Sequence, residues 1–411
     1  MKIYPVSPRK DFNQFLEKTG YHDVPYIESN YIAEISAEQA EILKSATREV
    51  YTMCLAAVGK VIEENRFKEF GIGELQAKHI RESWNRPLWS DGSTRDPELM
   101  SRIDFCWDGD NNPKFYEINA DTPGNFYECA VLQRTVKDDL VSRGELPEDM
   151  EQLNTLEEKT TERLSHIFNM ASQKITDTLH LASNSNADDM LQVKYLETLA
   201  QKAGWKTEYL DASQIGACED SSDENYGALF DAKDKRIDAL YKFIPWELIH
   251  ESGYAEYVAR DEIMFLEPAW KALLSNKMLS VILWEMYPNH PYLLASYTTP
   301  DELGNSYVEK PIFGLGGAGI KIVKDGKVIA EGHEKDGPDV PKIYQEYHPL
   351  PEAPGLAGRH YQTGTWIVGN GDVAGMDVRI GNGMIMDCDK KSKFLPHVVN
   401  PKQTSLKLEY K

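Results

Sequence analysis

Residues 102–124 read RIDFCWDGDNNPKFYEINADTPG, two strand-like runs separated by a polar segment. The segment DGDNNP is rich in Asp, Gly, Asn and Pro, the residues that favour turns. The flanking runs RIDFCW and KFYEINAD alternate polar and apolar side chains, as strands with two different faces do. The sequence therefore predicts a β-hairpin over residues 101–121.

The polar side chains of this hairpin are unusual for strands that only bury one face. If the chain turns at residues 110–111, Asp104 lies opposite Glu117 and Arg102 lies opposite Asn119. The apolar face then carries Ile103, Phe105, Tyr116 and Ile118. Mg²⁺ prefers oxygen ligands such as carboxylates, and a neighbouring guanidinium can hold a phosphoryl oxygen. The polar face is therefore either a magnesium site or a solvated strand face with a cross-strand ion pair.

A second motif, VEKPIFGLGGAGIKIV, occupies residues 308–323 and contains Gly314, Gly316, Gly317 and Gly319. Three of these glycines fit the pattern GxGxxG. In a dinucleotide-binding fold the last glycine opens a helix, whereas here the alternating run KIVKDGKVIA follows. We expect a strand–turn–strand flap whose backbone amides cover phosphates, with Lys310 reaching them from the preceding strand. A glycine-rich turn without a ligand is the alternative.

Composition excludes several classes of protein. The chain has 411 residues, 41% of them hydrophobic, and a formal net charge of −21. No Lys/Arg-rich block occurs, which argues against a nucleic-acid binder, because neutralising phosphates requires a basic face. The five cysteines form no CxxC pair, so neither a disulfide framework nor a zinc site is expected. With no N-terminal apolar segment and no run of about 18 apolar residues, we expect a soluble, cytoplasmic protein without a membrane partner.

Patterns along the rest of the chain predict an α/β (α+β) fold. Apolar residues at helical spacing indicate a long helix over residues 37–65. A strand, a helix and a second strand are expected over residues 179–211, and residues 245–274 read as mostly helical. From residue 306 the pattern is largely β. The expected lobes are a helical N-terminal part with the hairpin (1–175), a central α/β lobe (176–300) and a β-rich C-terminal lobe (301–411) whose glycine flap spans 310–320.

Known catalytic signatures do not account for these motifs. HRD with its downstream Asn and DFG are both absent, and the candidate metal ligands precede the flap, the reverse of the order in protein kinases. Neither GxSxG nor a Cys/His signature appears, so no nucleophile is visible. Lys277, Gln345, Gln362 and Arg379 stand out as isolated polar residues, but each alone reads as an ordinary surface residue. Any catalysis by this chain would therefore depend on charged side chains and on how they position the substrates.

Motifs spread over nearly the whole chain resemble one known family. They are RIDF with FYEINADTP, YLETLAQKAG, IPWELI, SNKMLSVILW, EKPIFGLGGAGIKI, IYQEYHPLP, TGTWIVGN, and GMDVRI followed by FLPHVV. In this order and spacing they resemble the synthetase domain of glutathionylspermidine synthase and its stand-alone homologues, an ATP-grasp-like group of acid–amine ligases. The resemblance implies an ATP-grasp-like fold, ATP and Mg²⁺ as cofactors, and a small-molecule carboxylate and amine as substrates. The resemblance does not fix the oligomeric state, and a homodimer is one of the states that it allows.

The resemblance also implies roles for individual residues. These are Arg102 and Arg379 as catalytic groups, Lys277, Lys310, Gly314, Gly316, Gly317, Gly319, Gln345, Glu346 and Gln362 around the nucleotide, and Asp104, Glu117 and Asn119 as magnesium ligands. In the implied reaction a substrate carboxylate attacks the γ-phosphate of ATP, and an amine then displaces phosphate from the acyl phosphate. Catalysis would come from the alignment of the reactants and from positive charge around the transferred phosphoryl group.

Three positions depart from the family pattern. The run Thr122-Pro123-Gly124 stands where the family carries serines that help to hold the thiol tripeptide. Leu315 replaces an arginine of the flap, and Lys393 stands where an acidic group faces the polyamine. We therefore predict that glutathione and spermidine are not the substrates.

Two further expectations concern activity. The amidase half of the bifunctional enzymes is absent from this sequence, so hydrolysis of a conjugate is not expected. The alternatives to a ligase are a nucleotide-binding sensor or scaffold without turnover, and phosphotransfer from beneath a glycine flap to a hydroxyl group.

Overall fold

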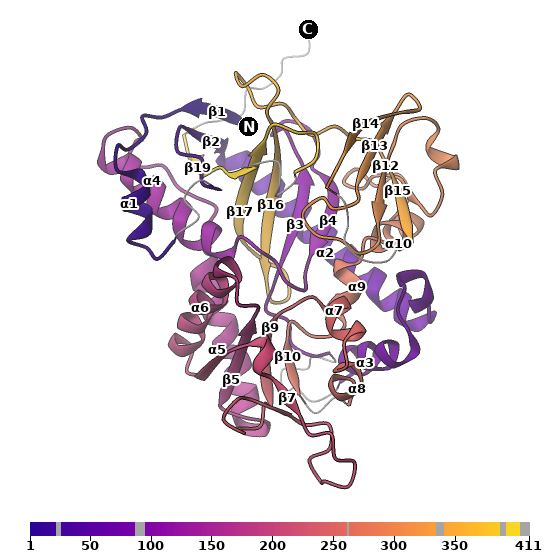
Figure 1. Ribbon diagram of the computed structural model, residues 1–411. Helices are drawn as coiled ribbons and strands as arrows, with labels where there is room; N and C mark the ends of the chain where they lie inside the picture. Colours follow the sequence, from indigo (N-terminus) through magenta and orange to yellow (C-terminus); the bar gives the residue numbers. More distant parts are fainter. Residues whose placement is uncertain (22–25, 87–94, 261–262, 334–340, 387–391, 403–411) are drawn as a thin grey trace.

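The structure is a computed structural model that describes residues 1–21, 26–86, 95–260, 263–333, 341–386 and 392–402. Figure 1 shows a central sheet, a second sheet below it and a third sheet beside it. Helices and strands alternate through much of the chain, so the predicted α/β architecture is confirmed.

The central sheet has five antiparallel strands in the order β18-β17-β16-β3-β4. Their bounds, in that order, are Lys393–Phe394, Asp372–Gly381, His360–Val368, Met100–Cys106 and Lys114–Asn119. β3, from the expected N-terminal lobe, pairs with β16, from the expected C-terminal lobe. These two parts of the chain thus share a sheet, and the lobe boundaries near residues 175 and 300 stay predictions.

The register of the predicted hairpin is confirmed beside its polar residues. Arg102 lies opposite Asn119 and Asp104 lies opposite Glu117. Opposed residues of an antiparallel pair project from the same face, so the sheet brings these four side chains together.

A bulge beyond these pairs changes the apolar face. Phe105 pairs with Phe115, which leaves Tyr116 without a partner in the ladder. The expectation that Tyr116 packs behind the hairpin is therefore wrong. Tyr116 packs instead with Leu350 and Met386, at the cavity described below.

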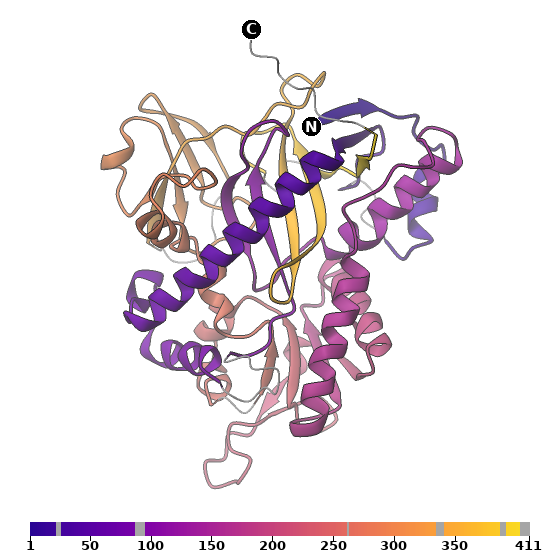
Figure 2. The same ribbon diagram turned by 180° about the vertical axis from the view of Figure 1, so that it is seen from behind.

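The long predicted helix is α2, Ala37–Glu63, which crosses the back of the central sheet in Figure 2. It begins at a capping box, in which the Gln39 amide donates to Ser36 Oγ at 3.1 Å and the Ser36 amide donates to Gln39 Oε1 at 2.9 Å. A hydrogen bond of 3.1 Å between the hydroxyls of Thr47 and Thr365 joins the helix to β16. The helices η2 (Phe67–Phe70) and α3 (Glu74–Trp84) follow α2.

The lower sheet is parallel, with the order β10-β9-β5-β6. Its strands are Met264–Leu266, Ala239–Phe243, Thr178–Ser183 and Lys206–Asp211, in that order. The helix α6 (Ala187–Lys202) joins β5 to β6, so the predicted strand–helix–strand unit is confirmed. α5 (Leu156–Lys174) packs on α6.

The expectation of mostly helix over residues 245–274 is wrong in part. α7 (Trp246–Glu251), α8 (Ala255–Val258) and the start of α9 (Lys271–Ser275) lie there, but they are short. β10 interrupts them, because its apolar run MFL extends the parallel sheet beside β9.

The third sheet, the flap sheet, has five strands in the order β11-β15-β12-β13-β14. Their bounds, in that order, are Ser296–Tyr297, Lys342–Glu346, Tyr307–Pro311, Lys321–Lys324 and Lys327–Glu331. The glycine motif links β12 to the antiparallel β13, so the predicted strand–turn–strand arrangement is confirmed. β13 and β14 turn at Asp325 and Gly326, whose φ angles of 50° and 73° suit a tight hairpin turn.

The remaining elements lie around these sheets. A small sheet joins β1 (Lys2–Pro5), β2 (Tyr31–Ser36) and β19 (His397–Asn400), and the short strands β7 (Gly216–Ala217) and β8 (Leu229–Phe230) pair with each other. The other helices are α1 (Phe12–Glu17), η3 (Glu128–Leu132), α4 (Gln133–Ser142), η4 (Ala212–Gln214), α10 (Leu279–Met286) and η5 (Asp301–Leu303).

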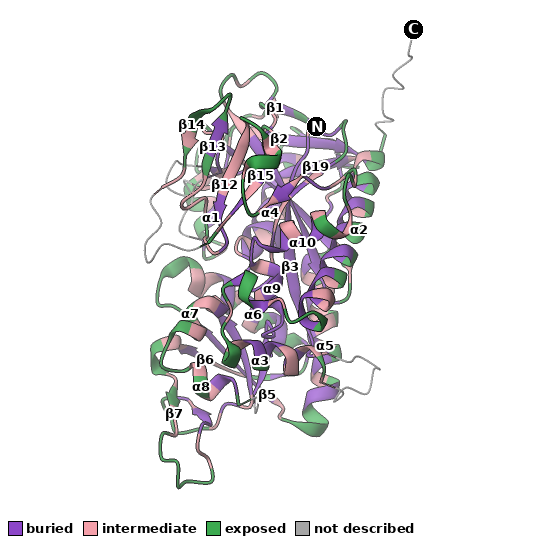
Figure 3. Cartoon of the chain, turned by 90° about the vertical axis from the view of Figure 1, so that its right-hand side faces the viewer, coloured by how far each residue is buried: buried purple, intermediate pink, exposed green. Residues whose placement is uncertain are grey.

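Burial is concentrated in the sheets. Figure 3 shows buried residues along the central strands and exposed residues on the outer sides of the helices. None of the helices in the described ranges combines the length and apolar character needed to cross a membrane.

Candidate functional site

A cavity, called here the main cavity, lies between the central sheet and the flap sheet. It contains about 840 Å³ of atom-free space, including solvent at its mouth. This size suits a small-molecule ligand. Its lining includes the following predicted site residues: Arg102, Glu117, Asn119, Lys310, Gly316, Gly317, Gln345, Glu346, Gln362 and Arg379.

Asp104 organises one wall of the main cavity from behind. Its carboxylate is fully buried and accepts hydrogen bonds from Arg102 Nε at 2.7 Å and Arg102 Nη2 at 3.0 Å. It also accepts from Arg379 Nη2 at 2.8 Å and Asn119 Nδ2 at 3.1 Å. These four contacts fix the orientation of two guanidinium groups and one amide.

Both guanidinium groups stay charged in this setting. Burial acts to lower the pKa of Arg102, but the charge and hydrogen bonds of Asp104 outweigh burial and raise it. The pKa of Arg379 is raised in the same way, against burial and the repulsion of Arg102. Arg102 Nη1 also donates to the Gly124 carbonyl at 2.6 Å.

Glu117 lies among cations at the edge of the main cavity. Its carboxylate is 3.3 Å from Lys277 Nζ, which also donates to the Gly314 carbonyl at 2.8 Å. Burial acts to raise the pKa of Glu117, but Lys277, Lys310 and Arg379 outweigh it and lower the pKa to about 2. Glu117 is therefore an anion throughout the neutral pH range.

Lys310 is held in place by Gln345. Its Nζ donates to Gln345 Oε1 at 2.7 Å and to the Tyr116 carbonyl at 3.3 Å, while Gln345 Nε2 donates to Ser296 Oγ at 3.2 Å. Burial lowers the pKa of Lys310 to about 8, and repulsion by Lys277 adds to this effect against the attraction of Glu117. Gln345, which was predicted near the nucleotide, lines the main cavity and also holds Lys310 there.

The donor set at the hairpin fits a magnesium ion bound with a nucleotide. Glu117 and Asn119 both line the main cavity, and the Asn119 amide nitrogen is turned to Asp104, which leaves the amide oxygen for a ligand. Mg²⁺ is commonly bound by one or two carboxylates together with substrate phosphates and water. Within the described ranges no three His, Cys, Asp or Glu side chains form a metal site of their own. Asp104 lies behind the other two residues, and its predicted role as a ligand stays a prediction.

The glycines of the flap have different surroundings. Gly316 and Gly317 line the main cavity with φ angles of 57° and 83°, values that favour glycine. Gly314 lines the neighbouring cavity and binds Lys277 through its carbonyl. Gly319 is among the lining residues of neither cavity, and its amide donates to the His333 carbonyl at 2.9 Å.

An apolar part of the main cavity was not found from the sequence. Its residues are Val308, Ile320, Ile322, Leu350, Met384, Ile385 and Met386, together with Tyr116, whose hydroxyl donates to the His348 carbonyl. In strand-like runs these residues cannot be distinguished from ordinary core residues. Gln362 and Arg379 are paired across β16 and β17, whereas Glu346 has an exposed side chain at the rim.

A second cavity adjoins the main cavity and shares Glu117 and Asn119 with it. Its other lining residues are Ile118, Asp121, Thr122, Pro245, Glu247, Ser275, Lys277, Phe313, Gly314 and Leu315. Two of the departures noted in the sequence, Thr122 and Leu315, thus face the same space. Lys393 pairs with Ile380 in the central sheet and is not among the lining residues of either cavity.

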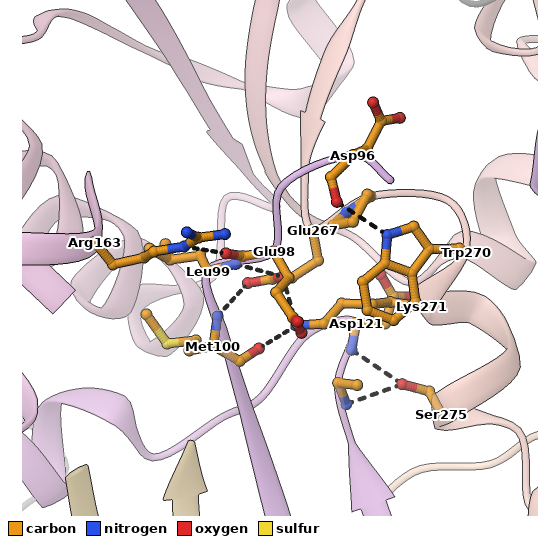
Figure 4. A network of polar contacts seen from close by, with 12 residues as sticks. Asp96, Glu98, Leu99, Met100, Asp121, Arg163, Glu267, Trp270, Lys271 and Ser275 are labelled. Carbon is orange, nitrogen blue, oxygen red and sulfur yellow. Dashed lines mark hydrogen bonds and ion pairs between the residues drawn. The ribbon is translucent and has the colours of Figure 1, made fainter. Parts of the chain in front are cut away.

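A buried polar network, drawn in Figure 4, anchors the start of β3. The Glu267 carboxylate accepts from the backbone amides of Leu99 at 3.0 Å and Met100 at 2.8 Å. Lys271 Nζ donates to Glu267 at 2.6 Å and to the Met100 carbonyl at 2.6 Å. These contacts tie α9 to the strand that carries Arg102 and Asp104.

Known proteins resemble the chain over almost its full length. The family model described as glutathionylspermidine synthase preATP-grasp matches residues 4–400. A Haemophilus influenzae protein whose name assigns it to the acid–amine ligases is 31% identical over 421 residues, which cover 97% of this chain and 98% of that protein. The bifunctional glutathionylspermidine synthetase/amidase of Escherichia coli is 26% identical over 397 residues, which cover 90% of this chain and 59% of that enzyme.

A solved structure with a similar fold is that of a glutathione synthetase-like effector from Globodera pallida. It has a TM-score of 0.58 and 11% sequence identity, and the match covers 97% of this chain and 100% of that one. This likeness concerns the fold alone. The sequence matches confirm the predicted resemblance: the chain belongs to the glutathionylspermidine synthase preATP-grasp family.

Proposed function

We propose that the chain is an ATP-dependent carboxylate–amine ligase that forms an amide bond through an acyl phosphate. The observation that carries this proposal is the meeting of two cavities at Glu117 and Asn119, where cations surround the junction. Arg102, Arg379, Lys277 and Lys310 lie around this junction, and they contact or face Asp104 and Glu117. Four cations at one place favour a polyphosphate and a phosphoryl group with spreading negative charge.

The main cavity suits the nucleotide. Its apolar part can hold a flat base, Gly316 and Gly317 can approach phosphates closely, and Lys310 points a cation into the same space. When bound, Mg²⁺ would neutralise phosphate charge and would be held by Glu117 and Asn119.

The second cavity suits the substrate carboxylate. In the first step a carboxylate oxygen forms a bond to the γ-phosphorus of ATP, and the bond from that phosphorus to its bridging oxygen breaks to release ADP. In the second step an amine nitrogen bonds to the acyl carbon, the bond from that carbon to the phosphate oxygen breaks, and the nitrogen loses a proton. Arg102 and Arg379, oriented by Asp104, are placed to stabilise the transferred phosphoryl group.

The substrates we propose are not glutathione with spermidine. Leu315 is exposed and lines the second cavity, where it offers no charge to a tripeptide carboxylate. Thr122 also lines this cavity and keeps a hydroxyl there, whereas Gly124 is not among the lining residues of either cavity and its carbonyl binds Arg102. Lys393 likewise lines neither cavity, which removes one argument against a polyamine, so this proposal rests on Leu315.

Hydroxylamine provides a test that does not depend on knowing the amine. It traps acyl phosphates as hydroxamates, which are measured by colour with ferric ion and by mass. Purified protein, ATP, Mg²⁺ and hydroxylamine are incubated with single carboxylic acids, including glutathione and common amino and dicarboxylic acids. We expect one class of acid to give hydroxamate and an equal amount of ADP.

The alternative function, a nucleotide-binding sensor or scaffold, predicts a different result. It predicts binding of the non-hydrolysable analogue AMP-PNP with Mg²⁺ but no acid-dependent ADP release. Phosphotransfer to a hydroxyl group predicts ADP release without hydroxamate.

A further inference from the structure

Ser275 occupies a special position at the end of α9. It lines the second cavity, two residues before Lys277 in the sequence. Its Oγ accepts hydrogen bonds from the backbone amides of Ala120 and Asp121, each at 3.0 Å. Figure 4 shows the side chain reaching the backbone beside Asp121, directly beyond the end of β4. The serine oxygen is therefore fixed relative to Asn119 and the polar face of the hairpin.

These two contacts decide what the hydroxyl can still do. A serine hydroxyl has one proton to donate and two lone pairs to accept with. Both lone pairs of Ser275 are occupied by the two amides, so only the proton remains. Within the part of the chain that the structure describes, this proton has no acceptor at hydrogen-bond distance. The side chain is partly exposed, and its open side is the second cavity, so the hydroxyl is a donor directed at whatever binds there.

The neighbours of Ser275 indicate which ligand atom it meets. Lys277 lies in the same cavity, with its Nζ bound to the carboxylate of Glu117 at 3.3 Å. A hydroxyl donor beside an ammonium group suits an oxygen that carries negative charge. Because Glu117 also lines the main cavity, an acid in the second cavity has its carboxylate close to where the nucleotide phosphates are expected.

We propose that Ser275 is a catalytic residue that donates a hydrogen bond to the carboxyl oxygen of the acid substrate and, after activation, to the carbonyl oxygen of the acyl phosphate. This inference rests on the proposed function. As the amine nitrogen bonds to the acyl carbon, negative charge develops on that carbonyl oxygen. The carbonyl double bond forms again when the bond from the carbon to the phosphate oxygen breaks, and phosphate leaves with the electron pair of that bond. A donor held by two backbone amides needs little reorganisation to stabilise that charge.

The experiment compares the wild-type protein with Ser275→Ala and Ser275→Thr. The first assay is hydroxamate formation with ATP, Mg²⁺, hydroxylamine and the acid that reacts best with the wild-type protein. The second assay is the binding of AMP-PNP with Mg²⁺, measured by calorimetry. Ser280→Ala is the matched control, because Ser280 is buried in the next helix and lines neither cavity.

We expect Ser275→Ala to lower the hydroxamate turnover number by about 10- to 100-fold, the loss typical of a hydrogen bond to a charged group. AMP-PNP affinity should stay within about threefold of wild type, since the hydroxyl faces the acid and not the nucleotide. Ser275→Thr keeps the hydroxyl and should restore most of the turnover. Where Ser275→Ala does not fold, Ser275→Cys offers a side chain of similar shape with a much weaker donor and should show the same loss.

Two results would overturn the role of Ser275. One is wild-type turnover in Ser275→Ala. The other is an equal loss of turnover and of AMP-PNP affinity, which would mean that Ser275 only holds the end of β4 in place. A wild-type protein that forms no hydroxamate with any acid would instead contradict the proposed function itself, and this inference would fall with it.

Discussion

Replacing Glu117 by Gln tests whether the cations of the site hold this carboxylate in its charged form. Burial acts against the charge, and Lys277, Lys310 and Arg379 outweigh burial to lower the pKa from 4.5 to about 2. A difference of this size corresponds to about 3 kcal/mol of folding free energy when the group is ionised. Because the folded pKa lies below the unfolded one, this stabilisation is present above the unfolded pKa and is lost as the pH falls toward the folded value.

The pH range over which this stabilisation is lost can be measured without any substrate. Between pH 6 and pH 3.5 the wild-type protein should lose about 1 kcal/mol of unfolding free energy through Glu117. Glu117→Gln should lack this contribution, so its stability should fall less steeply over the same interval. Urea denaturation at several pH values measures the difference, and Glu63→Gln, which removes an exposed carboxylate from α2, is the control. Parallel stability curves for wild type and Glu117→Gln would mean that folding does not lower the pKa of Glu117.

Three other predictions concern separate features. Arg102→Lys keeps a charge but loses the two-point contact with Asp104, so hydroxamate turnover should fall by about 100-fold; a fall below fivefold would contradict the role of the guanidinium. Because burial lowers the pKa of Lys310 to about 8, the affinity for AMP-PNP with Mg²⁺ should decrease as the pH rises from 7 to 9. Lys310→Gln should flatten this pH dependence of the affinity. The same pH dependence in both proteins would mean that Lys310 does not bind the phosphates. Ser36→Ala breaks the capping box of α2 and should lower the unfolding free energy by about 1 kcal/mol in urea, while an unchanged midpoint would mean that the cap adds no stability.

The parts of the structure that could be predicted from the sequence depend on local patterns. The turn-rich segment of the hairpin set its register, so the opposition of Asp104 to Glu117 was found from spacing alone. The strand–turn–strand flap followed from alternation around Asp325 and Gly326, and α2 followed from its apolar spacing.

The parts that could not be predicted depend on contacts between distant residues. Nothing in the sequence near β3 indicates that it pairs with β16. The bulge that turns Tyr116 to the main cavity is a change of one residue in register, which the alternation of side chains does not reveal. Asp104 is buried whereas Glu117 lines the main cavity, and Asp104 binds Arg379 of β17. This contact joins residues far apart in the sequence, so spacing alone could not predict it.

Acid-dependent formation of hydroxamate from ATP, Mg²⁺ and hydroxylamine is the most direct test of the proposed ligase reaction. We expect at least one class of carboxylic acid to give hydroxamate in equal amount to ADP, and we expect this product to fall by about 100-fold in Arg102→Lys and to decrease in Lys310→Gln. Tight binding of AMP-PNP by a protein that forms no hydroxamate with any acid, and releases no ADP in response to one, would contradict it.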